Sequence, residues 1–265
     1  MRRPTRSQAT ERTPRGWAVA GALCGLAGAT VLWAPATWLA RAVEGATQGQ
    51  VQLQQARGSV WNGSALLVLT GGSGSHDRAA LPTRLDWTLR PRHDGARLQL
   101  RSECCTSTPV ILQVQPRWQG LRVAVQDSDT RLPASLLAGL GTPWNTVALQ
   151  GQLRLATQGL QLQWQAGRWR SEGLTRLEAL AVSSRLSPLR PLGSYRLDIL
   201  GGDSPQLQLS TLHGDLQLSG QGQWVGQRLH FSGEAAASPE RETALSNLLN
   251  ILGRRQGPRS IISFG

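Results

Sequence analysis

The chain has 265 residues and a formal net charge of +12, and all 28 of its basic residues are arginine. This length is sufficient for one large domain or two small ones. The arginines are spread along the chain, no arginine-rich helix is predicted, and aromatic residues do not alternate with basic runs. The composition therefore argues against a nucleic-acid-binding protein.

The N-terminal region combines a basic tail with a long uncharged stretch. Residues 1–15 carry five arginines and one glutamate, a charge of +4, and the following 19 residues carry no charge. A helix of that length covers about 28 Å, close to the hydrocarbon thickness of a bilayer. Trp17 lies at one end of the apolar stretch, and Trp33 and Trp38 at the other, as in the aromatic belts of membrane helices. We predict a single transmembrane anchor over residues 16–40.

The basic tail sets the direction of this anchor. Positively charged flanks stay in the cytoplasm, so residues 1–15 are predicted to be a cytoplasmic tail and residues 41–265 a periplasmic domain at the inner membrane. A cleavable signal peptide is the alternative, because 34–36 reads Ala-Pro-Ala, the small-x-small form of a cleavage site. Both interpretations place residues 41–265 outside the cytoplasm.

Alternation of apolar and polar residues dominates the chain from residue 41 onward. Leu85, Trp87 and Leu89 are one such series, and others begin at Val51, Leu98, Val110, Leu121, Leu160, Tyr195, Leu207, Leu216 and Leu229. A period of two predicts strands with one apolar and one wet face, which is typical of antiparallel sheets. Short glycine-containing connectors indicate a meander. About a dozen strands are too many for one flat sheet, so we predict a mainly β domain whose sheet curls, folds over on itself or splits into two layers.

Two segments of the body are predicted to be helical. Residues 132–140 are sufficient for one or two turns, and residues 238–252 form the stronger candidate. Ser238 suits the N-cap, Pro239 suits the first helical position, and Gly253 suits the position after the last turn. An apolar stripe follows at helical spacing, formed by Leu245, Leu248, Leu249 and Leu252. We expect this short C-terminal helix either to close an open end of the sheet or to bind a partner.

The chain has three cysteines, of which Cys104 and Cys105 are adjacent. Outside the cytoplasm these two thiols would oxidise, either to a vicinal disulfide or to a disulfide between chains. No second cysteine or histidine pair stands at the spacing of a zinc site. Cys24 lies within the apolar stretch, where we expect it to be inert.

No catalytic constellation is recognised in the sequence. Asp127 and Asp129 would share one face of a strand, but a solvated turn before Arg131 explains both residues equally well. No nucleophile elbow and no phosphate-binding loop are present. We therefore predict that the protein is not an enzyme and that it uses neither a cofactor nor a metal ion.

The more prominent features are aromatic residues beside tight turns. Trp61 and Asn62 precede a glycine, and Trp144 and Asn145 repeat the pair after a proline. Tyr195 follows a segment that two prolines make rigid. These residues have two interpretations, namely turn geometry with buried rings or a docking surface for another envelope protein.

The chain resembles the type II secretion system protein N family at several of these segments. They are QGQVQLQQARGSVWNGSALLVLTGG (48–72), LPTRLDWTLRP (81–91), LPASLLAGLGTPWNT (132–146), LSPLRPLGSYRLDILGG (186–202) and LSGQGQWVGQRLHFSGEAAASPERETALSNLLNILGRR (218–255). The first and last segments are fairly specific in combination. The chain is also similar, more loosely, to AsmA-like envelope proteins, which share an N-terminal anchor and repeated amphipathic strands.

The resemblance to protein N implies an accessory inner-membrane component of the machine that exports folded proteins across the outer membrane of Gram-negative bacteria. It implies other inner-membrane components of this system and the outer-membrane secretin as partners, and no enzyme activity. The similarity to AsmA-like proteins implies an alternative, in which an apolar β-groove handles lipid or another hydrophobic ligand. Fold analogy alone is a weak argument for function.

Overall fold

The computed structural model describes residues 15–72, 74–226 and 228–265. The chain divides into two compact units, Met1–Ala34 and Pro35–Gly265. In the first unit, helix α1 (Arg15–Leu32) exposes apolar side chains such as Trp17 and Leu26. No helix among the described residues combines the length and the hydropathy needed to span a membrane. Fourteen of the fifteen residues of the predicted cytoplasmic tail lie outside the described residues.

The segment predicted as one helix over residues 16–40 forms two helices instead. Helix α1 ends at Leu32, and α2 (Ala36–Ala46) begins after Pro35, which is extended (φ −70°, ψ 149°) and forms a bridge with Ser59. Proline also lacks the N–H group that a continuing helix needs. Ala36 is buried and α2 packs on the first strands, so the body begins at Pro35 rather than at residue 41.

The body consists mainly of strands, which follow the alternating segments of the sequence closely. They are β1 (Val51–Gly58), β2 (Asn62–Thr70), β3 (Arg78–Ala80), β4 (Leu85–Arg92), β5 (Gly95–Ser102), β6 (Val110–Arg117), β7 (Gly120–Val125), β8 (Ser128–Pro133), β9 (Gln150–Gln165), β10 (Arg168–Ser183), β11 (Gly193–Gly202), β12 (Gln206–Gly214), β13 (Leu216–Val225), β14 (Arg228–Ala237), β15 (Arg254–Gln256) and β16 (Arg259–Phe264). All of them belong to one antiparallel sheet.

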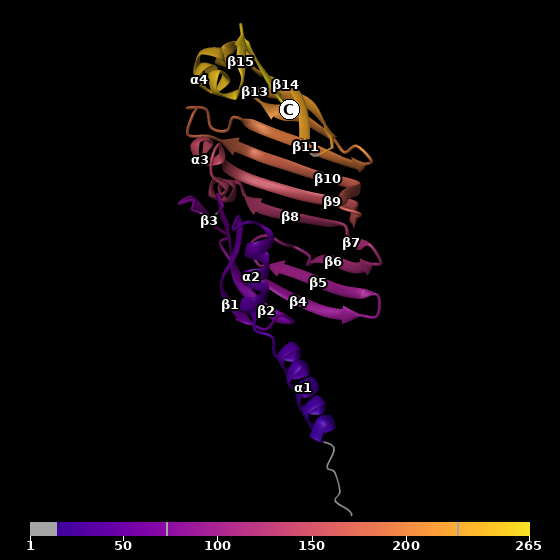
Figure 1. Ribbon diagram of the computed structural model, residues 1–265. Coiled ribbons are helices and arrows are strands. Elements are labelled where there is room, and N and C mark those ends of the chain that lie inside the picture. The colour runs from indigo at the N-terminus through magenta and orange to yellow at the C-terminus, as the bar shows by residue number, and fades with distance from the viewer. Residues whose placement is uncertain (1–14, 73, 227) are drawn as a thin grey trace, which may run out of the picture. The chain divides into compact units, whose positions relative to one another are not determined.

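The sheet is an open meander, as predicted, and it does not split into two layers. Its order is β1-β2-β4-β5-β6-β7-β9-β10-β11-β12-β13-β14-β16-β15, with β3 paired to β2 and β8 paired to β9. Nearly all neighbours in the sheet are therefore neighbours in sequence (Figure 1). The predicted mainly β class with a short C-terminal helix is confirmed.

The strand ends lie along the two long sides of the sheet, which are called edges here, and these two edges differ in their connections. An antiparallel meander reverses direction at every strand, so alternate connections lie on the same edge. One edge, which we call the hairpin edge, holds tight turns near residues 58–62, 92–95, 117–120, 165–168, 202–206 and 225–228. The other, the helix edge, holds η1 (Ala134–Leu140), α3 (Trp144–Val147), η2 (Pro239–Arg241) and α4 (Glu242–Leu252). In Figure 1 the turns of the β4–β5, β6–β7 and β9–β10 hairpins lie on the right and α3 and α4 on the left.

Helix α4 covers the sheet near its C-terminal end. Leu245, Leu248 and Leu249 are buried in a cluster that includes Tyr195 and Ala235 of the strands. Ser238 and Pro239 take the predicted N-cap and first helical positions, but those of a 3₁₀ turn, η2, and α4 itself starts at Glu242. The Ser238 hydroxyl donates to Asp215 rather than to the helix, and Gly253 is extended rather than left-handed.

Candidate functional site

The apolar residues of successive strands lie on one face of the sheet, which we call the apolar face. The registers place apolar partners opposite each other, because alternate side chains of paired strands share a face. The pairs that define the apolar face are Trp87 with Leu100, Leu98 with Leu112, Val114 with Val123, Val123 with Leu162, Leu155 with Leu177, Leu177 with Leu197, and Leu197 with Leu209.

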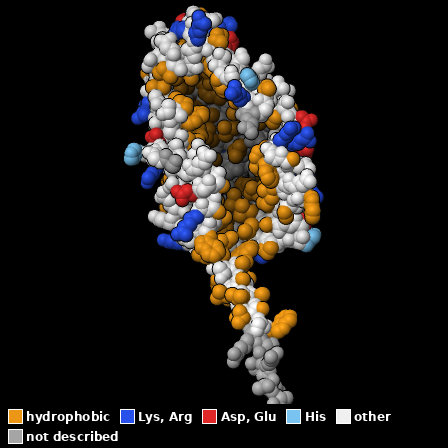
Figure 2. Space-filling model, in the orientation of Figure 1, with side chains coloured by type: hydrophobic (Ala, Val, Ile, Leu, Met, Phe, Trp, Pro, Cys, Tyr) orange, Lys and Arg blue, Asp and Glu red, His pale blue; other side chains and the backbone are white. Residues whose placement is uncertain are grey.

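Helices α2 and α4 cover the two ends of the apolar face, and η1 packs on it at the helix edge, where Leu136 lies in a cluster with Leu67, Leu69 and Leu132. At the N-terminal end α2 packs over a cluster around Trp87, and at the C-terminal end α4 packs over the cluster around Tyr195. Between these clusters, side chains such as Leu112, Leu162 and Leu177 are only half-buried. Figure 2 shows this middle stretch as a hollow with a largely hydrophobic wall. An apolar concave surface of this kind is able to hold a hydrophobic ligand.

The opposite face of the sheet is polar and carries ion pairs between neighbouring strands. The Arg154 guanidinium donates to Asp129 (Nε–Oδ2 2.9 Å), and Arg196 and Arg154 both reach the buried carboxylate of Glu178. The hydrogen bond and charge of Arg154 hold the pKa of Asp129 below its usual value. A hollow of about 930 Å³ at the C-terminal end is lined largely by polar side chains of this face, including Gln208. These features are those of a solvated outer surface.

The first predicted docking pair, Trp61 and Asn62, lies at the hairpin edge. Trp61 is half-buried in the turn between β1 and β2, and its carbonyl accepts a hydrogen bond from the Leu89 amide (2.7 Å). The exposed Asn62 closes the turn, because its backbone exchanges hydrogen bonds with Ser59. Trp61 and Asn62 therefore contribute to the geometry of the turn through their backbone hydrogen bonds.

The second pair, Trp144 and Asn145, lies at the helix edge, so the sheet does not bring the two Trp-Asn pairs together. Trp144 opens α3 and is 39% exposed, whereas the Asn145 amide donates to Asp77 (2.9 Å). Tyr195 is a core residue, since its ring is 8% exposed and its hydroxyl donates to the Leu216 carbonyl. Burial raises the pKa of Tyr195, and a docking role does not fit this position.

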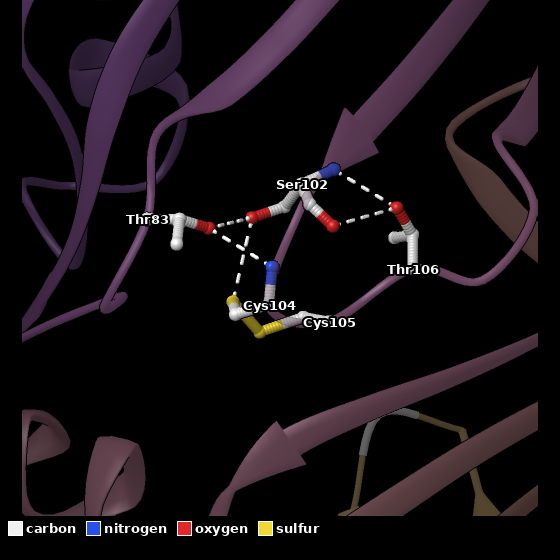
Figure 3. The surroundings of a disulfide bond; sticks show 5 residues. All are labelled: Thr83, Ser102, Cys104, Cys105 and Thr106. Carbon is white, nitrogen blue, oxygen red and sulfur yellow. Dashed lines mark hydrogen bonds between the residues drawn. A yellow bond between two sulfur atoms is a disulfide. The ribbon is translucent and has the colours of Figure 1, made fainter.

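Cys104 and Cys105 are joined to each other by a disulfide in the turn between β5 and β6. Cys105 is buried against Leu81 and Leu136, so it connects this turn to the core beneath η1. The Cys104 amide donates to the Thr83 hydroxyl (3.2 Å), and Ser102 and Thr106 hydrogen-bond across the turn (Figure 3). The pair therefore shapes a packed turn at the helix edge.

Sequence reasoning missed a set of exposed tryptophans at the hairpin edge. Trp118, Trp164 and Trp169 flank the turns of the β6–β7 and β9–β10 hairpins and are 99%, 41% and 64% exposed. Their signal in the sequence is an indole beside a Gln-Gly or Ala-Gly turn, in RWQGL (117–121) and WQAGRWR (164–170). Indole rings normally lie inside a protein or at an interface.

The family model of type II secretion system (T2SS) protein N matches residues 49–262. The matched range runs from just before β1 into β16, so it includes nearly the whole sheet and its apolar face. No curated protein and no solved structure shows a significant similarity to the chain.

Proposed function

The chain belongs to the type II secretion system protein N family, and on that premise we propose that it is an accessory inner-membrane component of this system. Its role is that of a periplasmic scaffold or assembly factor in the export of folded proteins across the outer membrane. The observation that carries the proposal is the family match over nearly the entire sheet. The proposed role is not enzymatic and needs no cofactor.

Part of the proposal is that α1 anchors the chain in the inner membrane, with the N-terminus in the cytoplasm and the sheet in the periplasm. The uncharged residues 16–34 after an arginine-rich tail support this topology. The exposed apolar side chains of α1 support it as well, among them Trp17, Leu23 and Leu26. A topology reporter fused after Gly265 tests it, since activity only in the cytoplasm would contradict the proposal.

The proposed partners are other inner-membrane components of the secretion system and the outer-membrane secretin. Trp61 and Trp144 remain candidates for docking because both keep exposed surface, at opposite edges of the sheet. An elongated sheet with two separate edges suits a scaffold, because it offers distinct surfaces to different partners.

Deleting the gene is expected to lower the release of the system's cargo into the medium and to leave folded cargo in the periplasm. A scaffold lost from the machine impairs its assembly, so crosslinked complexes of the other components should also decrease. Cargo activity in the medium and in the periplasm measures the effect, and the full chain supplied in trans is the control. Unchanged secretion together with unchanged assembly contradicts the proposed role.

A second candidate function is the binding of a hydrophobic ligand, such as an acyl chain, on the apolar face. It rests on the open stretch between the two helix-covered ends. From β6 to β12 that stretch includes six strands. The five spacings between them, at about 4.8 Å each, give a width of about 24 Å. An acyl chain that fills one leaflet is about 15 Å long, so the stretch is sufficient for a lipid.

The double variant Leu177→Asp with Leu197→Asp places two charges in the middle of the apolar face and is expected to abolish retention of lipid. Mass spectrometry of the full chain after detergent exchange gives the lipid retained per protein. Gln208→Asp on the polar face is the matched control, and circular dichroism checks folding. No lipid on the unmodified chain, or equal retention by all three proteins, counts against this function.

A further inference from the structure

The hairpin edge gathers aromatic residues that the packing of the sheet does not use. Trp164 and Trp169 are paired across β9 and β10, and Trp118 lies on the neighbouring turn between β6 and β7. These three rings are 41%, 64% and 99% exposed. Exposed indoles that cluster on one edge of a folded domain mark an interaction surface.

The same edge is strongly basic. The segments 57–61, 90–95, 117–120, 164–170, 201–205, 224–226 and residue 228 contain seven arginines and two aspartates, a net charge of +5. The arginines are Arg57, Arg90, Arg92, Arg117, Arg168, Arg170 and Arg228, and all seven are exposed. Each aspartate is already within an ion pair, Asp94 with Arg92 (3.5 Å) and Asp203 with Arg170 (3.3 Å).

The helix edge does not share this character. Its arginines are interspersed with Asp77, Glu103, Asp215, Glu240 and Glu242. Some of these acids pair directly, as Glu242 does with Arg255 (3.0 Å). The segments 71–84, 103–109, 184–192, 238–258 and residue 215 of the helix edge contain seven arginines and five acids, a net charge of +2. The excess of positive charge is therefore larger at the hairpin edge (+5) than at the helix edge.

A small hollow lies among these residues. It has a volume of about 390 Å³ and is lined by Arg117, Trp118, Arg122 and Trp164, together with neighbouring residues of the two hairpins. The buried Nε of Arg122 has no hydrogen-bond partner within the described part of the chain. A guanidinium group with a free N–H, beside a second arginine, is suited to bind a phosphate group.

From these observations we propose that the hairpin edge docks on a membrane surface that contains anionic phospholipids. Indole rings prefer the level of the lipid headgroups, and the arginines complement the negative surface charge. The hollow between Trp118 and Trp164 receives a lipid phosphate. When the hairpin edge lies on the membrane, the part of the apolar face at this edge also lies next to the bilayer. This inference is independent of the role in secretion, because it concerns contact with lipid alone.

The test is a fluorescence-quenching experiment on the full chain. Cys24→Ser removes the free cysteine, and Gln119→Cys adds one thiol in the exposed β6–β7 turn without removing an indole. An environment-sensitive dye on this thiol reports contact with spin-labelled headgroups. The chain is reconstituted in vesicles of phosphatidylcholine alone or with phosphatidylglycerol. Ser135→Cys, exposed on η1 at the helix edge, is the matched control site.

Docking predicts quenching at the Gln119 site in the anionic vesicles, little quenching in the neutral ones, and none at the Ser135 site. High salt should reverse the quenching by screening the charges. The triple variant Arg117→Gln, Arg168→Gln and Arg170→Gln should weaken docking about 100-fold, since each arginine near an anionic surface contributes about fivefold.

Three outcomes would overturn the proposal. The first is no quenching at the Gln119 site in anionic vesicles, and the second is equal quenching at both labelled sites. The third is equal quenching in neutral and anionic vesicles, which excludes the arginines as the cause. None of these results depends on whether the deletion strain secretes cargo, so the failure of one proposal is distinguishable from the failure of the other.

Discussion

Leu249→Ala is expected to lower the free energy of unfolding by about 2–5 kcal/mol, the usual cost of removing a fully buried leucine side chain. Leu249 is 0% exposed in α4 and lies in the cluster with Tyr195, Leu216 and Ala235 of three strands. The helix holds the sheet mainly through this stripe, because the opposite side of α4 faces solvent, as the exposed Ile251 shows.

Denaturant unfolding of the full chain in mild detergent measures this change, and hydrogen exchange locates it. Exchange should increase first in α4, β14 and β16, the elements that contact each other there. Ile251→Ala on the same helix is the matched control and should change the stability by less than about 0.5 kcal/mol, since its side chain is 52% exposed. Equal effects of the two substitutions would show that α4 does not stabilise the sheet.

Trp87→Ala should have a similarly large effect at the other end of the sheet, about 3–5 kcal/mol. The Trp87 side chain is 3% exposed and packs with Ala36 of α2 and Ala65 of β2. Its Nε1 donates to the Val60 carbonyl (3.1 Å), so the ring also holds the turn that contains Trp61. Gly63 leaves the space for the ring, because a Cβ atom at that position would overlap it.

The control for this prediction is Trp118→Ala, which removes the same side chain from a position that is 99% exposed and should leave the stability nearly unchanged. Trp87→Phe separates the two contributions, since it keeps most of the packing and loses a hydrogen bond of about 1 kcal/mol. Hydrogen exchange after Trp87→Ala should increase in α2, β1 and β2 while α4 stays protected. If Trp87→Ala and Trp118→Ala destabilise equally, the packing of α2 through Trp87 is not important for stability.

Local patterns in the sequence accounted for most of the architecture. The alternation in segments such as 85–89 and 195–199 placed strands correctly, because the period of two depends only on which face of a strand is buried. Short connectors gave the meander, and the leucine stripe over 245–252 gave the C-terminal helix. Residues 78–80 form β3 although they belong to none of the alternating segments, since β2 offers them an unpaired stretch.

The candidate sites depended more on the tertiary structure. Tyr195 belongs to an alternating segment like any other strand residue, and only the position of α4 makes it a core residue. Trp61 and Trp144 have similar sequence surroundings but lie at opposite edges. Successive connections of a meander alternate between the two edges, so the number of strands between two connections decides whether they share an edge. For the same reason, Trp118 and Trp164 line one hollow although they lie 46 residues apart in the sequence.

The sequence by itself determined that this chain forms amphipathic antiparallel strands after an apolar N-terminal segment, and it indicated the family. These properties follow from residues a few positions apart, which set period, turn and charge. The tertiary structure alone decided that a second helix, α2, begins after Pro35 and packs on the body, that the sheet is single and concave, and that α2 and α4 leave the middle of its apolar face uncovered. The burial of a side chain and its contacts depend on the pairing of strands that are distant in sequence. No local sequence pattern encodes how much of the apolar face α2 and α4 cover.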